Sequence, residues 1–485
     1  MSNPADLVYT IAKDKLPAEW SLATISDLAG KDGVFVDGDW VESKDQDPDG
    51  DVRLIQLADI GDGEYRNKSK RFLTHEKAIQ LGCTYLEKGD VLIARMPDPL
   101  GRACIYPGDK KKSVTVVDVA IVRPAGNAFD ARWLMYFVNA PAFRSAVASM
   151  QSGSTRKRIS RGNLSKIVLP VPPLDQQKRI VAEIEKQFSR LDEAVANLKR
   201  VKANLKCYKA AVLKAAVEGR LVETEAERAR REGRSYETGT QLLQRILETR
   251  RSQWQGKGKY KEPAAPDTTD LPELPEGWGW ANVDQLAEVG TGATPKRDQA
   301  RYYGGDIPWV TSAVVNDTFV DHAAEFVTSD ALAETNLTLY QPGTLLVAMY
   351  GEGKTRGKCS ELRIAATTNQ ALAALRADEN VRPYLKQFLE YNYEEMRKVA
   401  SGGVQPNLNL SLVRAVCVPL PPMAEQHRIV AEVDRRLTLL RATEAQVDAN
   451  LQRAERLRQT ILTSAFSGGI HRSKVIQSFT ATPTI

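Results

Sequence analysis

The chain has 485 residues, which allows roughly two to four domains, and a formal net charge of +6 that is compatible with a polyanionic partner. No apolar stretch approaches the ~18 residues of a membrane span, and the first residues lack a secretory leader, so we expect a cytoplasmic protein. The five cysteines are scattered along the chain, which argues against a zinc site.

Residues 1–170 are predicted to form a mixed α/β domain. Short apolar runs, such as residues 91–94, alternate with turn residues, and residues 132–148 have the composition of a helix. About 150 residues are enough to enclose one hydrophobic core.

Residues 171–221 are predicted to be a long helix. Prolines end the strand-like run before it, and a stretch rich in Ala, Leu, Glu, Lys and Arg follows without Pro or Gly until Gly219. An ordinary surface helix is the alternative, but the length and a seven-residue apolar register favour a coiled-coil seam. The register consists of Ile184, Leu191, Leu198, Leu205 and Val212.

Residues 222–270 are predicted to connect this helix to the second half of the chain. Residues 223–234 and 241–251 have the composition of charged helices. A Lys/Gly-rich stretch and a Pro/Asp/Thr-rich stretch follow, and we expect these to form a mobile linker.

Residues 271–419 and 420–470 repeat the first domain and the first long helix. The segment at 170–184 returns without a gap at 419–433, and Leu-Pro-x-x-Trp ends at both Trp20 and Trp278. A period this long indicates a duplicated domain pair rather than a solenoid. The second helix keeps the apolar register with Val433, Leu440, Val447, Ala454 and Ile461.

The predicted fold is therefore of the α/β class, with two α/β domains joined by two long helices that form an antiparallel coiled coil. Two equal helices in one chain would most simply pair with each other. Outside the short matching segments, the sequences of the two domains differ almost completely. Two domains with one framework and different sequences are suited to the recognition of two different targets. Residues 471–485 are predicted to be a polar tail.

Two short motifs resemble catalytic motifs, but each matches the known pattern only in part. Residues 351–355 end like a phosphate-binding loop, yet Ala348 stands at the position of its first glycine. Asp98 with Asp109 and Lys111 fits a loose pattern for a magnesium nuclease, but the second domain has no counterpart. We therefore expect a chain without catalytic residues and without a metal or cofactor of its own.

Several motifs occur here together: the Pro-rich helix start at 170–181 and 419–430, the run at 291–295 followed by 303–310, and a Gly-x-[Leu/Val]-Leu-[Ile/Val]-Ala strand in each domain. In this combination the chain resembles the specificity (S) subunit of type I restriction–modification enzymes. The first domain lacks the forms found at 291–295 and 303–310, so its reading surface is harder to place.

The resemblance implies two target recognition domains that each read one half of a split site in double-stranded DNA. It also implies that the two conserved helices set the spacing between the half-sites and dock modification (M) subunits. Two M subunits would complete the methyltransferase, and two restriction (R) subunits would add the ATP-dependent nuclease. S-adenosylmethionine would then be bound by the M subunits, and ATP and Mg²⁺ by the R subunits.

Candidate DNA-binding residues lie in the loops after the strands at 91–94 and 345–348, in the basic run at 156–161, and just after Pro295. The loop cations could contact base edges, whereas the basic run and the two cations after Pro295 are expected to contact phosphates. The candidates are Arg95, Arg102, Arg156, Lys157, Arg158, Arg161, Lys296, Arg297, Tyr350, Lys354, Arg356 and Lys358. For any one of them the alternative is a solvated side chain without a ligand.

Two other functions remain open at this point. A coiled-coil scaffold that joins two protein-binding domains would have no salt-sensitive affinity for DNA. A magnesium nuclease would cleave DNA as a purified chain and would lose that activity on Asp98→Ala.

Overall fold

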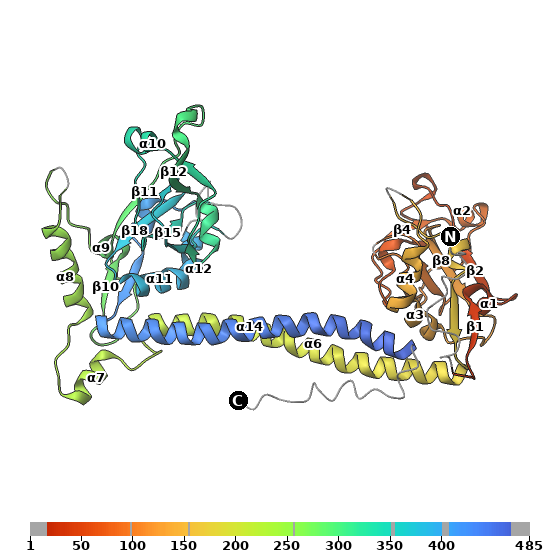
Figure 1. Cartoon of the computed structure of the whole chain (residues 1–485). Coiled ribbons are helices and arrows are strands. Elements are labelled where there is room, and N and C mark those ends of the chain that lie inside the picture. Colours follow the sequence, from red (N-terminus) through yellow and green to blue (C-terminus); the bar gives the residue numbers. More distant parts are fainter. Residues whose placement is uncertain are drawn as a thin grey trace. The chain divides into compact units, whose positions relative to one another are not determined.

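The computed structural model describes residues 17–97, 99–153, 156–255, 258–350, 355–399 and 407–466. The chain divides into two compact units, one of Met1–Lys199 with Asp448–Ile485 and the other of Arg200–Val447. Each unit holds one α/β domain and parts of both long helices (Figure 1). The α/β parts are called domain 1 (residues 17–171) and domain 2 (residues 275–420) below.

Domain 1 contains two principal sheets. The first is antiparallel and has the strand order β2 (Val34–Asp37), β8 (Val119–Arg123), β5 (Val91–Ala94), β6 (Ala103–Ile105). The second has the order β4 (Arg71–Leu73), β3 (Val52–Ile55), β7 (Ser113–Thr115), in which β3 and β7 are parallel. A separate antiparallel pair joins β1 (Ser21–Thr24) to β9 (Val168–Val171).

The connecting helices of domain 1 are short. They are α1 (Ile25–Ala29), α2 (His75–Gln80), α3 (Ala131–Asn139), α4 (Pro141–Ser149) and α5 (Arg161–Leu164), with single turns η3 (Ser43–Asp45) and η4 (Leu57–Asp59). Helix α3 begins where the Asp130 side chain accepts hydrogen bonds from the N–H groups of Arg132 and Trp133.

Domain 2 repeats this arrangement of sheets, with one additional strand at the edge of its larger sheet. Its larger sheet has the order β11 (Ala287–Thr291), β18 (Leu372–Ala377), β15 (Leu345–Ala348), β16 (Cys359–Leu362), β13 (Phe319–Val320). Its smaller sheet has the order β14 (Glu325–Val327), β12 (Tyr303–Val310), β17 (Thr367–Thr368), with β12 and β17 parallel. The pair β10 (Gly279–Asn282) and β19 (Cys417–Leu420) corresponds to β1 and β9. The duplication predicted from the sequence is thus confirmed in the sheet order.

The helical elements of domain 2 occupy the corresponding positions. They are α9 (Val283–Leu286), α10 (Ser329–Glu334), α11 (Arg382–Tyr391), α12 (Tyr393–Val399) and α13 (Leu410–Arg414), with short 3-10 helices η5 (Ala300–Tyr302) and η6 (Ser312–Asn316).

Each domain has an equivalent central strand, β5 in domain 1 and β15 in domain 2, that is buried on both faces. In β5, Val91 and Ile93 belong to one hydrophobic cluster, whereas Leu92 and Ala94 belong to another. This alternation is expected because successive side chains of a strand point to opposite faces of the sheet. Strand β15 shows the same division, so each domain is built around the equivalent central strand.

The two long helices, α6 (Leu174–Val217) and α14 (Met423–Phe466), contain 44 residues each. In the first unit, Ile184 near the start of α6 shares a core with Ile461 near the end of α14. In the second unit, Val212 near the end of α6 shares a core with Val433 near the start of α14. The helices therefore run antiparallel, as predicted.

The predicted heptad positions face inward along both helices. Leu440, Val447 and Ala454 of α14 are buried, and Leu191, Leu198 and Leu205 of α6 are partly buried between exposed neighbours. Each domain also anchors the helix ends that belong to its own unit. In domain 1, the Phe466 ring meets the Phe137 ring edge-on, with centroids 5.0 Å apart.

The predicted charged helices of the connector are present as α7 (Glu225–Glu232) and α8 (Gly239–Ser252). A capping box between Thr224 and Glu227 starts α7, and Gly233 ends it in the left-handed conformation. Leu242 and Ile246 of α8 are buried in the core of domain 2. None of the helices described is long and apolar enough to cross a membrane.

Candidate nucleic-acid interface

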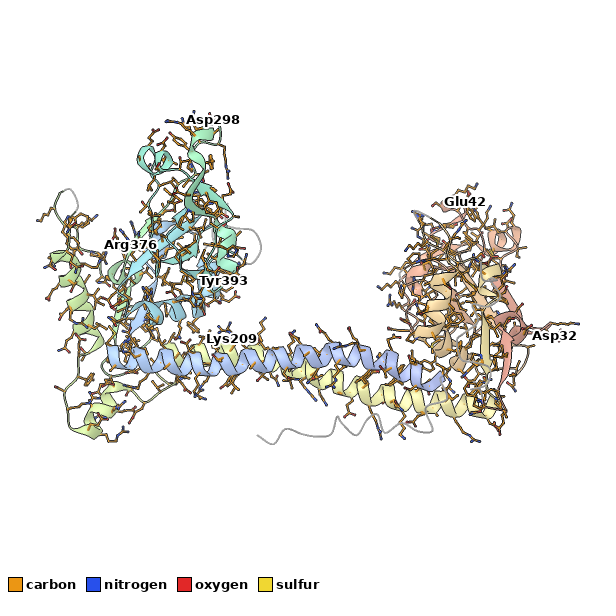
Figure 2. All side chains as sticks on the ribbon, viewed as in Figure 1. Asp32, Glu42, Lys209, Asp298, Arg376 and Tyr393 are labelled. Atoms are coloured by element: carbon orange, nitrogen blue, oxygen red, sulfur yellow. The ribbon has the colours of Figure 1, made fainter. Side chains whose placement is uncertain are left out.

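The loops of domain 1 that follow β2, β3, β5 and β7 surround a cavity of about 780 Å³. They meet there because β3 and β7 are parallel, and because Asp39 forms a parallel bridge to Val116 that joins the two sheets. Figure 2 labels Glu42, which lines this cavity, on the part of domain 1 away from the long helices of its unit. The residues lining the cavity include Trp40, Glu42, Gln56, Met96, Asp118, Arg156 and Arg158.

Two of the predicted DNA-binding arginines have their guanidinium groups bound inside domain 1. Arg102 is 5% exposed and donates to the carbonyl oxygens of Leu57, Ile60, Met96 and Pro99 at 2.6–3.2 Å. These carbonyl groups occupy the N–H donors of Arg102, so the prediction that Arg102 contacts a base edge is wrong. Its guanidinium instead fixes the loop after β5.

Arg95 also has a structural role. Its Nε lies 3.1 Å from Oδ1 of Asp37, and its Nη2 donates to the Val117 carbonyl at 2.6 Å. A second hydrogen bond, of 3.3 Å, runs from Nη1 of Arg95 to the carbonyl of Ile159. Arg95 therefore ties the end of β2 to the walls of the cavity, and this occupies the guanidinium that was expected to face a base.

The basic run of domain 1 is exposed, as its predicted role requires. Arg156, Lys157, Arg158 and Arg161 are all exposed, and their side chains form no ion pair with another described residue. The Arg158 backbone pairs with Ser152 through two hydrogen bonds of 2.8 and 2.9 Å, which fixes the local backbone. Arg156 and Arg158 lie at the cavity, where their charges can attract phosphates.

In domain 2, Lys296 is exposed whereas Arg297 is engaged within the domain. The Arg297 guanidinium donates to Glu325 at 2.7 Å and lies over the rings of Tyr303 and Trp309, 4.8 and 5.2 Å from their centroids. The ion pair and the stacking orient the guanidinium of Arg297, whose side chain is still exposed, so its predicted contact with phosphate stays a prediction. Asp298, the next residue, lies at the tip of domain 2 (Figure 2).

The predicted loop after β15 is described only in part, because Lys354 lies outside the described residues. Tyr350 is 39% exposed, and Lys358 donates from Nζ to Oδ1 of Asn316 at 2.8 Å. Arg356 is half-buried, and its backbone carbonyl accepts from Arg397 at 3.4 Å. Tyr350, Arg356 and Lys358 thus lie at the end of β15 that corresponds to the cavity end of β5 in domain 1.

Of the nuclease motif suggested by the sequence, Asp109 and Lys111 lie among the described residues. Asp109 accepts a hydrogen bond of 2.7 Å from Arg53, which holds the pKa of Asp109 below its usual value. Asp98 lies outside the described residues. Within the described part of the chain, no three His, Cys, Asp or Glu residues are grouped so that they could hold a metal ion.

The sequence did not single out three residues that line the cavity, namely Trp40, Gln56 and Asp118. The candidates chosen from the sequence were mainly cations in the loops after β5 and β15 and in short basic runs. The three lining residues are distant in sequence, and the pairing of β3 with β7 together with the bridge between Asp39 and Val116 brings them to one cavity. One signal was available, since Trp40 is a lone aromatic residue in the acidic, Gly-containing run at 37–42.

The chain is similar to known proteins over most of its length. The family model described as "Type I restriction modification DNA specificity domain" matches residues 17–206 and 275–452. The chain is 27% identical over 173 residues to the type I restriction enzyme MjaIX specificity subunit of Methanocaldococcus jannaschii, covering 33% of this chain and 38% of that protein. It is 24% identical over 343 residues to the EcoBI specificity subunit of Escherichia coli, covering 68% of this chain and 64% of that protein.

A solved structure shares the fold. It comes from work on complex assembly and conformational transition of the type I R-M system, and its chain superposes with a TM-score of 0.64 at 18% sequence identity. The superposition covers 94% of this chain and 100% of the other.

Proposed function

Since this chain belongs to the family of type I restriction–modification DNA specificity proteins, we propose that it reads a split DNA target, with one half-site for each domain. The observation that carries the proposal is that both domains contain the same arrangement of two sheets and one strand pair, whereas their loops differ. One framework used twice, with different side chains at the same loops, is suited to reading two different half-sites. The antiparallel helices would set the distance between those half-sites.

The long helices also offer a surface for modification subunits. Val201 and Tyr208 of α6 are seven residues apart and therefore lie near one face of the helix, where they are 41% and 47% exposed. Leu439 of α14 is 65% exposed. Exposed apolar side chains on helices mark candidate protein interfaces. We therefore expect two M subunits to dock along the helices and two R subunits to join that complex.

In this proposal the chain is not itself an enzyme. S-adenosylmethionine would be held by the M subunits, and ATP and Mg²⁺ by the R subunits. This chain would supply sequence recognition through its loops and subunit placement through its helices. We expect the isolated chain to bind DNA weakly, because docking along the helices would be needed to hold both domains on one duplex.

The test is to express the chain with its modification partner and to map methylated adenines in the host genome by single-molecule sequencing. The expected result is one motif made of two short specific parts separated by a fixed gap. A continuous motif, or no methylated motif in the presence of an active partner, would contradict the proposal. Binding titrations at several salt concentrations would separate it from the scaffold alternative, which predicts no salt-sensitive affinity for DNA.

A nuclease test addresses the other alternative. The purified chain would be incubated with DNA and Mg²⁺ beside its Asp98→Ala variant. We expect no cleavage by either protein, whereas cleavage lost on Asp98→Ala would support the magnesium nuclease instead.

A further inference from the structure

Trp40 is the most exposed of the large hydrophobic side chains that the structure describes, at 70%. It stands on the segment that follows β2 and lines the cavity of domain 1. Leaving an indole in water forgoes the favourable burial of a large apolar surface. An exposed aromatic ring beside a cavity is therefore a candidate for contact with a ligand.

The backbone under Trp40 is held rigidly. Asp39 N donates to the Thr115 carbonyl at 2.8 Å, the Asp39 carbonyl accepts from Val117 N at 2.9 Å, and the Asp39 carboxylate accepts from Thr84 N at 2.9 Å. A Cβ at Gly38 would lie 2.3 Å from the Val116 carbonyl oxygen, so this approach requires glycine. The ring is thus presented from a fixed position, which reduces the entropy lost when a ligand binds.

The Trp40 ring is also oriented. Its Nε1 donates to Oε1 of Glu42 at 3.3 Å, and Glu42 forms an ion pair of 2.7 Å with Lys44. These contacts hold the polar edge of the indole on its own loop. The apolar faces of the ring remain available for contact.

The other groups around the cavity match the parts of a DNA duplex. Arg156 and Arg158 can neutralise phosphates, whereas the amide of Gln56 and the carboxylate of Asp118 can pair with base edges. Apolar side chains contact the methyl group of thymine in the major groove. Trp40 and Met96 supply apolar surface of this kind beside the polar groups.

Domain 2 has the same backbone at this place but a different side chain. Ala293 N donates to the Thr368 carbonyl at 3.0 Å, just as Asp39 N donates to Thr115. A Cβ at Gly292 would lie 1.7 Å from the Thr368 carbonyl oxygen, so Gly292 corresponds to Gly38. The residue in the position of Trp40 is therefore Thr294, whose Oγ1 donates to Gln370 at 2.6 Å.

We infer that the cavity of domain 1 reads base edges of the first half-site and that Trp40 is a specificity-determining residue there. The backbone at this position is the same in the two domains, whereas the side chain is Trp40 in one and Thr294 in the other. A residue that discriminates between DNA sequences is expected to vary in this way on a constant backbone. The inference rests on the proposed function, because it assigns residues to one of the two half-sites.

The test uses the full chain assembled with its modification partner. Trp40→Ala and Trp40→Phe are compared with wild type and with Ile79→Ala, which removes another exposed apolar side chain of domain 1, 63% exposed on α2 and outside the cavity lining. Methylated motifs are mapped by sequencing. Competition binding with duplexes that carry single base changes then measures discrimination at each position, and thermal unfolding checks that each variant is folded.

Trp40→Ala is expected to reduce discrimination on the order of tenfold at one or two positions of a single half-site. Trp40→Phe should retain part of it, and Ile79→Ala all of it. The inference is overturned if Trp40→Ala leaves every position unchanged, weakens all sequences equally, or alters the half-site read by domain 2. In those cases a split motif from the wild-type complex would still uphold the proposed function, whereas a wild-type complex without one would overturn both.

Discussion

Trp278 donates its indole N–H to the carboxylate of Glu425 at 3.0 Å, in a buried position where domain 2 meets the start of α14. The equivalent bond in domain 1, also 3.0 Å, runs from Trp20 to the side-chain oxygen of Gln176. Each bond joins the start of an α/β domain to the start of the long helix that follows it. The duplication thus extends to single hydrogen bonds, but an ionisable acceptor is used in one copy and a neutral one in the other.

This difference predicts a pH-dependent stability for domain 2. Glu425 is fully buried, and burial raises its pKa above the ordinary value of 4.5. Because the folded-state pKa exceeds the unfolded one, the stabilising contribution of Glu425 is fully present below about pH 4.5 and is lost as pH rises through the folded pKa. Relative to Glu425→Gln, the wild-type chain should therefore lose free energy of unfolding as pH rises above 4.5.

Urea denaturation of both full chains between about pH 4.5 and 8 measures this difference. Glu225 lies beside Glu425, and although burial opposes the shift, its bonds to Arg234 and Arg428 lower the pKa of Glu225. Glu225 is present in both proteins, so its contribution largely cancels in the comparison. A difference that grows in favour of the wild type with rising pH would show that the carboxylate of Glu425 is stabilised by its surroundings.

Arg102→Ala should destabilise domain 1. The substitution removes the guanidinium that donates to the carbonyl groups of Leu57, Ile60 and the loop after β5, at a cost of about 3 kcal/mol. Arg161→Ala serves as the control, because that side chain is exposed in the same domain. Thermal unfolding should show a clear drop in Tm for Arg102→Ala alone, and equal Tm values for the two variants would refute the structural role.

Arg156→Ala and Arg158→Ala should weaken binding to all DNA sequences by similar factors. Both side chains are exposed at the cavity of domain 1, where they are expected to contact phosphates. Each lost phosphate contact should reduce the slope of log K against log salt by about 1. Salt titrations of the assembled complex measure this slope. A change of the methylated motif with an unchanged slope would instead assign these arginines to base edges.

Substitutions in the loop after β15 should affect one half-site only. Lys354→Ala, Arg356→Ala and Lys358→Ala change residues of domain 2, and loss of a base contact should cost on the order of 1–3 kcal/mol at one position. Asn316→Ala is a useful companion, because Asn316 accepts the hydrogen bond from Lys358. If these variants alter the half-site that also changes when domain 1 is exchanged, the assignment of one domain to one half-site fails.

Insertion of four residues after Arg200 in α6 should alter the gap between the half-sites. The insertion adds about one helical turn and leaves the apolar stripe roughly in phase, so the helices can still pair. We expect either loss of methylation or a motif with a different gap and the same two specific parts. Altered half-site sequences would mean that the helices, not the domains, read the DNA.

The duplicated domains and the antiparallel helices could be predicted from the sequence because their signals are local and repeated. A heptad register such as Ile184, Leu191 and Leu198 specifies which face of a helix is buried without knowledge of its partner. The constant offset between the two helix starts likewise needs no coordinates, since it compares the chain with itself. For the same reason the buried central strands β5 and β15 were located correctly.

Which side chains are available to a ligand was decided only by the tertiary structure. Arg95 and Arg102 have the charge expected of DNA-binding residues, but carbonyl groups far away in the chain, such as that of Leu57, occupy their guanidinium groups. Trp40 lacks that charge, yet the pairing of its loop with Val116 places it beside Arg156 at an open cavity. Whether a side chain is available to DNA depends on which distant backbone groups the fold brings to it, and no local pattern in the sequence encodes that.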